Sequence, residues 1–185
     1  MDSAPAIVRH NFDLWRSLTP DYDLQVFHRQ NVEDLVQSDI PFWESIPPQA
    51  LSDIVRSKVL AQSGGVWVDA ALMPSKPLKH WLPTVSKNGF FAFEKPGPDR
   101  PVSSWFLASS PNHLLLEKWL QETLRYWQKN RKLAQTSSFT EGLTPSEIVN
   151  PKHSERAQEY PYFWFHYLFS YLLETDLSFK THWSE

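Results

Sequence analysis

Residues Ser52–Leu78 read S-D-I-V-R-S-K-V-L-A-Q-S-G-G-V-W-V-D-A-A-L-M-P-S-K-P-L, and this stretch decides the fold. Around its start, apolar side chains recur every four residues, at Leu51, Val55 and Val59. This spacing places them on one face of a helix. Gly64 and Gly65 follow directly, and a glycine just past the last periodic residue often ends a helix because it adopts positive φ without strain. The pattern predicts a helix over residues 48–63.

A short strand with an acid at its end comes after the two glycines. Residues 66–68 (V-W-V) are strand formers, and Asp69 follows them at once. In α/β sheets, ligands bind at the edge formed by the carboxyl ends of the strands. Upstream, Asp53 and Arg56 are three residues apart on the predicted helix and therefore face the same way. Together, the three charged residues indicate a ligand-binding site.

The composition excludes several classes of protein. The chain of 185 residues has the length of one domain, and its net charge of −3 offers no electrostatic footprint for nucleic acid. Because it has no cysteine, disulfide frameworks and thiolate metal sites are excluded. We expect neither a membrane span nor a signal peptide, because no apolar stretch is of the required length. Most of the nine Trp, twelve Phe and six Tyr residues are expected in the core.

The other elements follow from apolar periodicity and turn residues. The expected elements are a helix over residues 4–18, a strand at 24–28, a short helix at 31–36, strands at 89–93 and 104–108, a helix at 111–130, a short helix from the Thr144–Glu147 capping box, and a buried helix at 160–174. Ser110 is expected to cap the helix that starts at Pro111. The polar residues 131–139 are expected to form a mobile loop.

The pattern S-D-x-x-R followed by G-G-V-W-V-D-A resembles the sugar-nucleotide-binding core of GT-A glycosyltransferases. The resemblance is closest to the capsular-polysaccharide-synthesis type and to relatives whose sugar-binding region contains a D-x-D motif. The matching positions are Asp53, Arg56, Gly64, Gly65, Trp67 and Asp69. Ala71 stands where the second acid of D-x-D would be, and capsular-type members often lack that acid. The resemblance implies an α/β fold of three layers, GT-A-like, in a single domain over residues 1–185.

Members of this family normally begin with a strand of the type P-K-I-I-W before the first helix, at a central place in the nucleotide-binding sheet. The present sequence starts Met1-Asp2-Ser3 and passes directly into the predicted first helix. We therefore expect a GT-A-like sheet in which the first strand is missing or another segment fills the gap.

The resemblance also implies an activity. The chain would transfer a sugar from a nucleotide-diphosphate sugar to a saccharide acceptor, with retention of the anomeric configuration, in polysaccharide or glycan assembly. It would work in the cytoplasm, associated peripherally with a membrane. Asp53 and Arg56 would reach the ribose or the donor sugar, a role that suits arginine because its planar guanidinium forms two parallel hydrogen bonds. The resemblance assigns no catalytic residue.

A divalent cation, Mn²⁺ or Mg²⁺, belongs to the implied chemistry. Asp69 would hold it against the two phosphates of the donor, where it offsets the charge of the leaving group. Mg²⁺ keeps several waters and takes only one or two carboxylates, so a single acid suffices. His182 is a candidate for completing the metal site. Trp105 is a candidate for the acceptor side, and an assignment to the core is equally consistent with its sequence context.

Simpler interpretations stand beside each of these roles. By spacing alone, Asp53 and Arg56 form a solvated ion pair that contributes little stability, and Asp69 caps a turn. His166, on an aromatic helix, is interpreted as a core histidine. At the level of function, the alternative is a non-catalytic GT-A-like remnant that binds a partner or a saccharide. An aromatic-lined carbohydrate-binding module is a further alternative, but it predicts an all-β chain, which the helical stripes contradict.

Overall fold

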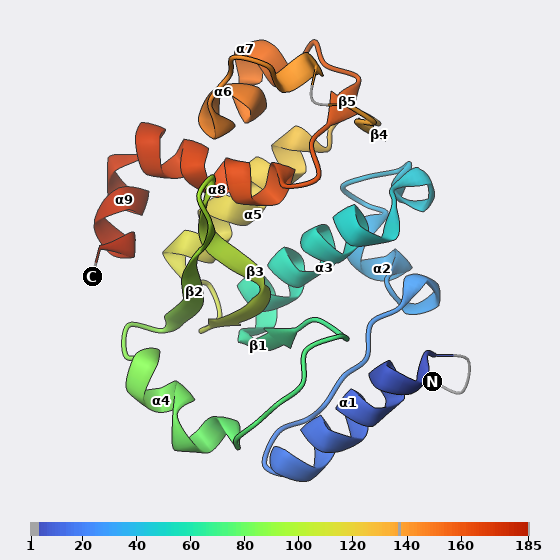
Figure 1. Ribbon diagram of the computed structural model, residues 1–185, viewed down its shortest axis with the longest axis vertical. Coiled ribbons are helices and arrows are strands. Elements are labelled where there is room, and N and C mark those ends of the chain that lie inside the picture. Colours follow the sequence, from blue (N-terminus) through green and yellow to red (C-terminus); the bar gives the residue numbers. More distant parts are fainter. Residues whose placement is uncertain (1–3, 137, 185) are drawn as a thin grey trace.

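The computed structural model describes residues 4–136 and 138–184. Figure 1 shows a small sheet near the middle of the molecule, with helices on both sides of it. The sheet consists of β1 (Gly65–Val68), β2 (Phe90–Gly97) and β3 (Arg100–Ser109) in the order β1-β3-β2, and both pairings are antiparallel. The chain is mixed α/β, as predicted. Its likeness to the GT-A fold stays a prediction.

The larger part of the core lies on one face of the sheet, beneath α3 (Pro48–Ser63), α5 (Leu114–Tyr126) and α8 (Trp164–Thr175). The apolar stripe predicted for residues 48–63 is buried here. Trp119 of α5 stacks on Phe165 of α8 with ring centroids 4.0 Å apart, and both side chains are fully buried. As expected, many of the aromatic residues therefore serve the core.

A smaller cluster covers the opposite face of the sheet. It joins α1 (Ala6–Leu18) and α4 (Leu82–Val85) to β3. Its buried members are Trp15, Leu78, Leu82, Phe106 and Ala108. The sheet is thus enclosed by a thick helical layer on one face and a thin one on the other.

Short elements connect these layers. The remaining α-helices are α2 (Glu33–Val36), α6 (Pro145–Val149), α7 (Pro151–Ser154) and α9 (Leu177–Trp183). Turns of 3₁₀-helix lie at Arg29–Asn31, Trp43–Ser45, Leu78–His80 and Ser138–Thr140. A second, parallel sheet pairs β4 (Lys132–Leu133) with β5 (Glu159–Tyr160). The capping box predicted for α6 is present, with reciprocal bonds between Thr144 and Glu147.

The junction between α3 and β1 requires a glycine. Gly64 has φ +66°, and a Cβ atom added there would lie 2.6 Å from Cδ of Pro111. The N–H of Asn112 donates to the carbonyl of Ala61 over 2.8 Å, so residues 110–112 are held against the end of α3. For this reason α5 begins at Leu114 with His113 as its N-cap, and the predicted start at Pro111 with Ser110 as the cap is wrong.

Three other expectations are corrected. Residues 24–28 form no strand, because a cavity lined by both segments lies between them and the free edge of β1, and they pair with no strand of the described chain. The helix expected from residue 160 begins at Trp164, because Glu159 and Tyr160 form β5. Within the polar residues 131–139, which were expected to form a mobile loop, Arg131 is buried and donates to three backbone carbonyls, those of Tyr126, Ser154 and Ala157.

In the part of the chain that the structure describes, no helix combines the length and the apolar character needed to cross a membrane.

Candidate functional site

The structure brings together the three charged residues that the sequence singles out. Arg56 lies on the buried side of α3 and is 3% exposed. Its Nη2 atom is 3.4 Å from Oδ1 of Asp53 and 3.1 Å from Oδ1 of Asp69. One guanidinium therefore lies between two carboxyl groups, one from its own helix and one from the end of β1. The interpretation of Asp53 and Arg56 as a merely solvated pair is wrong, because both are buried.

Several neighbours fix the orientation of Arg56. Nη1 donates to the carbonyl of Ser104, Nη2 donates to Oγ of Ser52 over 2.9 Å, and Nε donates to the carbonyl of Ser52 over 3.3 Å. The guanidinium also lies over the ring of Trp67, with Cζ 5.2 Å from the centroid. The sequence did not point to Ser104, because a backbone carbonyl carries no sequence signal. Ser52, in contrast, is the first residue of the S-D-x-x-R pattern, so the sequence could have pointed to it.

Asp69 is held at the open end of β1. Its Oδ1 accepts a hydrogen bond of 2.9 Å from Nε1 of Trp67, and its N–H donates to the carbonyl of Trp105 over 2.9 Å. The side chain is 39% exposed, in contrast to 12% for Asp53 and 4% for Arg56. Among the three charged residues, Asp69 is thus the group that a ligand reaches first. Trp67 packs at the sheet as expected and also orients this carboxylate.

Asp53 differs from Asp69 in its protonation. Burial raises the pKa of Asp53 to about 7; Arg56 opposes the rise and the charge of Asp69 adds to it. Near neutral pH this carboxyl is therefore divided between its neutral and its charged form. The site can hold a proton at Asp53 without losing the contact of Arg56 with Asp69.

Two residues from the C-terminal part of the chain lie near this site, and the sequence did not place them there. Tyr160 is fully buried, and its hydroxyl has no hydrogen-bond partner among the described residues. Burial, with a contribution from Asp53, raises the pKa of this hydroxyl to about 12. Burial also lowers the pKa of His166 to about 4, with help from the charges of Arg56 and Arg100. His166 is therefore a neutral imidazole near the guanidinium of Arg56.

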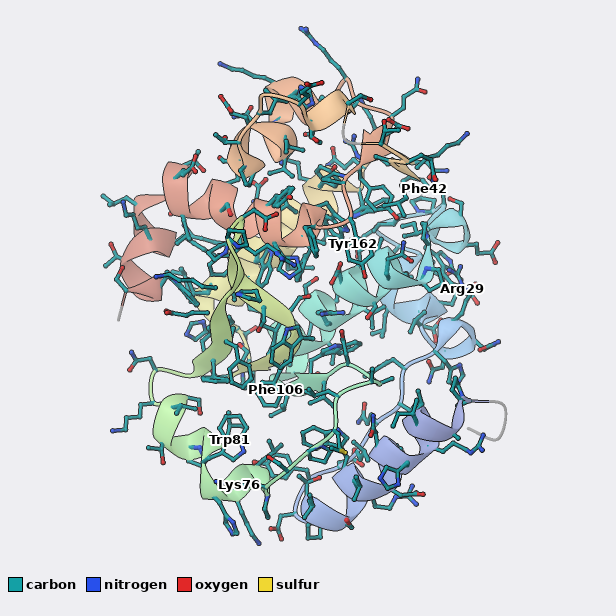
Figure 2. The ribbon with its side chains drawn as sticks, in the orientation of Figure 1. Arg29, Phe42, Lys76, Trp81, Phe106 and Tyr162 are labelled. Carbon is teal, nitrogen blue, oxygen red and sulfur yellow. The ribbon has the colours of Figure 1, made fainter. Side chains whose placement is uncertain are left out.

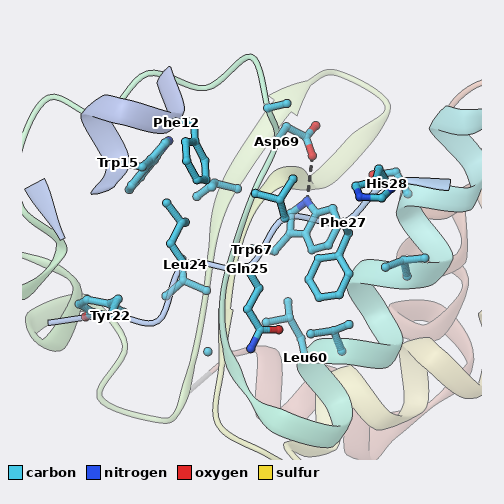
Figure 3. A pocket seen from close by; sticks show the side chains of 18 of the residues that line it. Phe12, Trp15, Tyr22, Leu24, Gln25, Phe27, His28, Leu60, Trp67 and Asp69 are labelled. Atoms are coloured by element: carbon cyan, nitrogen blue, oxygen red, sulfur yellow. Dashed lines mark hydrogen bonds between the residues drawn. The ribbon is translucent and has the colours of Figure 1, made fainter. Parts of the chain in front are cut away.

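A cavity of about 820 Å³ lies beside the site (Figure 3). One wall belongs to α3 and β1 and the opposite wall to α1 and the extended residues 23–28. On the wall of α3 and β1, Figure 3 labels Leu60, Trp67 and Asp69. On the opposite wall it labels Phe12, Trp15, Leu24 and Phe27. Phe27 reaches across to stack on Trp67 with ring centroids 5.9 Å apart. Pockets of this size, mostly apolar with a few polar groups, are typical of small-molecule sites.

The edge of β1 forms part of this cavity. Within the described chain β1 pairs only with β3, so its other edge is unpaired, and residues 65–70 line the cavity. Two side chains of α1 bond to the loop that follows β1. Nδ2 of Asn11 donates to the carbonyl of Ala70 over 3.1 Å, and Nε1 of Trp15 donates to the carbonyl of Leu72 over 2.9 Å. The loop after Asp69 is thereby attached to α1.

Trp105 and His182, the other two site candidates from the sequence, lie apart from each other. Trp105 is half-buried on β3, and its carbonyl bonds to Asp69 as described above. His182 lies exposed on α9, where its Nδ1 is 2.9 Å from the carbonyl of Ser178. The helix α9 packs on α5 and α8 rather than on β1. The structure therefore brings the backbone of Trp105, but not His182, to Asp69, while the ring of Trp105 stacks on Phe93.

The donor set at Asp69 is a poor fit for a metal ion held by the protein. Among the described residues, no group of three His, Asp or Glu side chains is placed to hold one. Oδ1 of Asp69 is already engaged by Trp67 and Arg56. The guanidinium supplies, beside this carboxylate, the positive charge that a cation would bring.

A comparison with protein families gives a match for the N-terminal part of the chain. A family model described as "Capsular polysaccharide synthesis protein" matches residues 1–140, which is more than half of the chain. The matched part includes Asp53, Arg56, Asp69 and Trp105, whereas His166 and His182 lie beyond it. Comparisons with curated proteins and with solved structures gave no match.

Proposed function

Because the chain belongs to the family of capsular polysaccharide synthesis proteins, we propose that it is a glycosyltransferase. It transfers a sugar from a nucleotide-diphosphate sugar to a saccharide acceptor, with retention of configuration. The observation that carries the proposal is the guanidinium of Arg56 between Asp53 and Asp69, at the margin of a cavity of about 820 Å³. A cavity with convergent polar groups and a shifted pKa is the usual mark of a ligand site.

The charges of the site suit a sugar more than a bare phosphate. Hydroxyl groups of the donor sugar donate to the free oxygen of Asp69, and Arg56 offers its N–H groups to sugar oxygens. A fully ionised pair of carboxyl groups would repel the diphosphate. The raised pKa of Asp53 reduces that negative charge near pH 7. The nucleotide then occupies the apolar cavity along β1.

The expectation of a divalent cation stays a separate part of the proposal. Asp69 has one oxygen not engaged by Trp67 or Arg56, and a cation bound there would take its other ligands from phosphate and water. Because the donor set of the described residues fits a metal poorly, no step of the proposed reaction is assigned to it.

Calorimetric titration with UDP- and GDP-sugars, with and without Mn²⁺, tests the proposal. Asp69→Asn keeps the size of the side chain and the bond from Trp67 but removes the charge. We expect it to weaken donor binding about 10- to 100-fold, the range for a hydrogen bond to a charged group. The matched control is Asp21→Asn, which removes an exposed carboxylate paired with Lys79 and should leave binding unchanged. Equal affinities for wild type and Asp69→Asn would sink the donor-site assignment.

A second candidate function is a saccharide- or partner-binding remnant without transferase activity. Ala71 in place of the second acid favours it, as does the absence, among described residues, of a three-ligand metal group. The two functions separate in one assay: a folded chain that binds no nucleotide sugar, with or without Mn²⁺, would support the remnant.

A further inference from the structure

The antiparallel ladder between β2 and β3 is interrupted beside the candidate site. Leu107 of β3 is paired on both sides, with Trp67 of β1 and with Ala92 of β2. Towards the hairpin tip, β3 is next paired with β2 at Val102, so residues 103–106 have no partner in the regular register of β2. A stretch that leaves the ladder in this way depends on other contacts for its position.

This stretch carries two backbone acceptors that hold the candidate site. The carbonyl of Ser104 accepts from Nη1 of Arg56, and the carbonyl of Trp105 accepts from the N–H of Asp69 over 2.9 Å. The positions of Arg56 and Asp69 therefore depend on where residues 103–105 are held.

The tip of the hairpin between β2 and β3 is fastened to α8. The hydroxyl of Tyr167 donates to Oδ2 of Asp99 over 2.7 Å, and Nε of Arg100 donates to Oδ1 of Asp99 over 3.1 Å. The guanidinium of Arg100 lies over the ring of Phe163, the N-cap residue of α8, with Cζ 3.8 Å from the centroid. Figure 1 shows the tip of the hairpin beside α8, and β3 packs on this helix.

The fastening is more specific than an exposed ion pair. A Cβ atom added at Gly97 would overlap the guanidinium of Arg100, so this group is enclosed between the backbone of Gly97 and a ring of α8. Burial and the bond to Asp99 raise the pKa of the Tyr167 hydroxyl to about 12. Burial opposes ionisation of Asp99, but hydrogen bonds from Tyr167 and Arg100 lower the pKa of its carboxyl. At neutral pH the bond thus joins a protonated hydroxyl to a carboxylate, which is a strong combination.

The helix α8 lies close to the candidate site as well as to the hairpin tip. The pKa of His166 on this helix is lowered to about 4 by burial, and the charges of both Arg56 and Arg100 contribute. In Figure 2, Phe106 marks the interrupted stretch of β3 and Tyr162 marks the chain just before α8. One helix therefore adjoins both ends of the connection from the hairpin tip to Arg56.

We propose that Tyr167 is a positioning residue of the candidate site. By holding Asp99 at the hairpin tip, it fixes the stretch of β3 whose carbonyls hold Arg56 and Asp69. Without its hydroxyl the tip moves on α8, and the adjoining stretch, which β2 does not restrain, moves with it. The effect on donor binding rests on the proposed function, whereas the coupling of α8 to Asp69 does not.

Amide hydrogen exchange measured by NMR tests the coupling in Tyr167→Phe, which removes one hydroxyl and keeps the ring. The amide of Asp69 should exchange about 3- to 10-fold faster, because its acceptor is the carbonyl of Trp105. The amide of Trp67 should be unchanged, because its partner Leu107 is paired on both sides. Thermal unfolding confirms that the variant is folded.

The matched control is Tyr171→Phe, because Tyr171 is also half-buried and lies one turn further along α8. It should leave the amides of Asp69 and Trp67 as they are. The positioning role is overturned by an unchanged Asp69 amide in Tyr167→Phe, by the same acceleration in Tyr171→Phe, or by equal acceleration of Asp69 and Trp67.

Two substitutions of Asp99 provide a rescue test. Asp99→Ala removes the acceptor and should accelerate the Asp69 amide as Tyr167→Phe does. Asp99→Asn keeps an oxygen that accepts from Tyr167 and should restore most of the lost protection. Equal acceleration in both variants would show that the bond from Tyr167 is not what holds the tip.

Titration of Tyr167→Phe with UDP- and GDP-sugars separates this inference from the proposed function. If the wild type binds a nucleotide sugar, the variant should bind it about 2- to 10-fold more weakly. Equal affinity despite a faster Asp69 amide would overturn the role of Tyr167 in positioning the site. If the wild type binds none, a faster Asp69 amide in the variant would leave the coupling standing and remove the transferase.

Discussion

Asp53 and Arg56 are two ionisable groups buried side by side, and the stability of the chain depends on how they are charged. A buried guanidinium needs a partner, because removal of one member of a buried ion pair leaves the other uncompensated. Arg56 has two partners, and Asp69 keeps its contact when Asp53 takes up a proton. Protonation of Asp53 is therefore tolerated in the native state, which agrees with its raised pKa.

This raised pKa predicts a fall in the free energy of unfolding as pH rises. Below about pH 4 the carboxyl of Asp53 is protonated in both states. Between about 4 and 7 the unfolded chain loses the proton and the native chain keeps it, so the free energy of unfolding decreases. Above about pH 7 the free energy of unfolding no longer decreases on account of Asp53. Asp53→Asn should remove this pH dependence. At about 1.4 kcal/mol per pKa unit, the total decrease in the free energy of unfolding in the wild type is at most on the order of 4 kcal/mol.

Urea unfolding followed by circular dichroism between pH 4 and 8 measures the effect. Asp34→Asn is the control, because Asp34 is an exposed carboxylate on α2, and it should keep the wild-type slope. A slope in Asp53→Asn equal to that of the wild type would show that another group is responsible.

At the scale of elements, the passage from α3 to β1 is the most constrained connection. Gly64 combines a positive φ with a close approach to Pro111, while Gly142 has a positive φ of +76° with open space around it. Gly64→Ala should therefore cost more than Gly142→Ala, about 2–4 kcal/mol against about 1 kcal/mol. Chemical unfolding of the two variants gives the comparison. Equal losses would mean that Pro111 moves aside without cost.

Local patterns predicted the elements that depend on local causes. The stripe and the glycines predicted α3, β1 and the joint position of Asp53, Arg56 and Asp69, because these follow from helical spacing and chain direction. The strand at 24–28 was wrong, since strand propensity does not tell whether a partner lies beside it. The start of α5 was wrong because the bond from Asn112 to Ala61 joins distant parts of the chain.

At the scale of the whole molecule, the two faces of the sheet are unequally covered. The face under α3, α5 and α8 carries most of the core, whereas α1 is attached through Trp15, a few neighbours and two side-chain hydrogen bonds. Segments with few buried contacts open at lower free energy than the core. The expectation of one domain over the chain stays a prediction.

Hydrogen exchange measured by mass spectrometry tests this difference. Amides of α1 should exchange at least about tenfold faster than those of the interior turns of α3, because opening α1 exposes only the smaller cluster. Trp15→Phe, which removes the bond to Leu72, should accelerate exchange in α1 and leave α3 unchanged. Equal protection of the two helices would show that the sheet and both its layers open as one unit.

The contacts of Trp67 have an optical consequence. Its indole N–H is bonded to Asp69, its ring lies under the charge of Arg56, and one face stacks on Phe27 at the cavity. Indole emission responds to nearby charge and to the polarity around the ring. A molecule that takes Asp69 or Arg56 as its partner therefore alters the emission of this tryptophan, and Trp67→Phe identifies its share of the signal among the nine tryptophans of the chain.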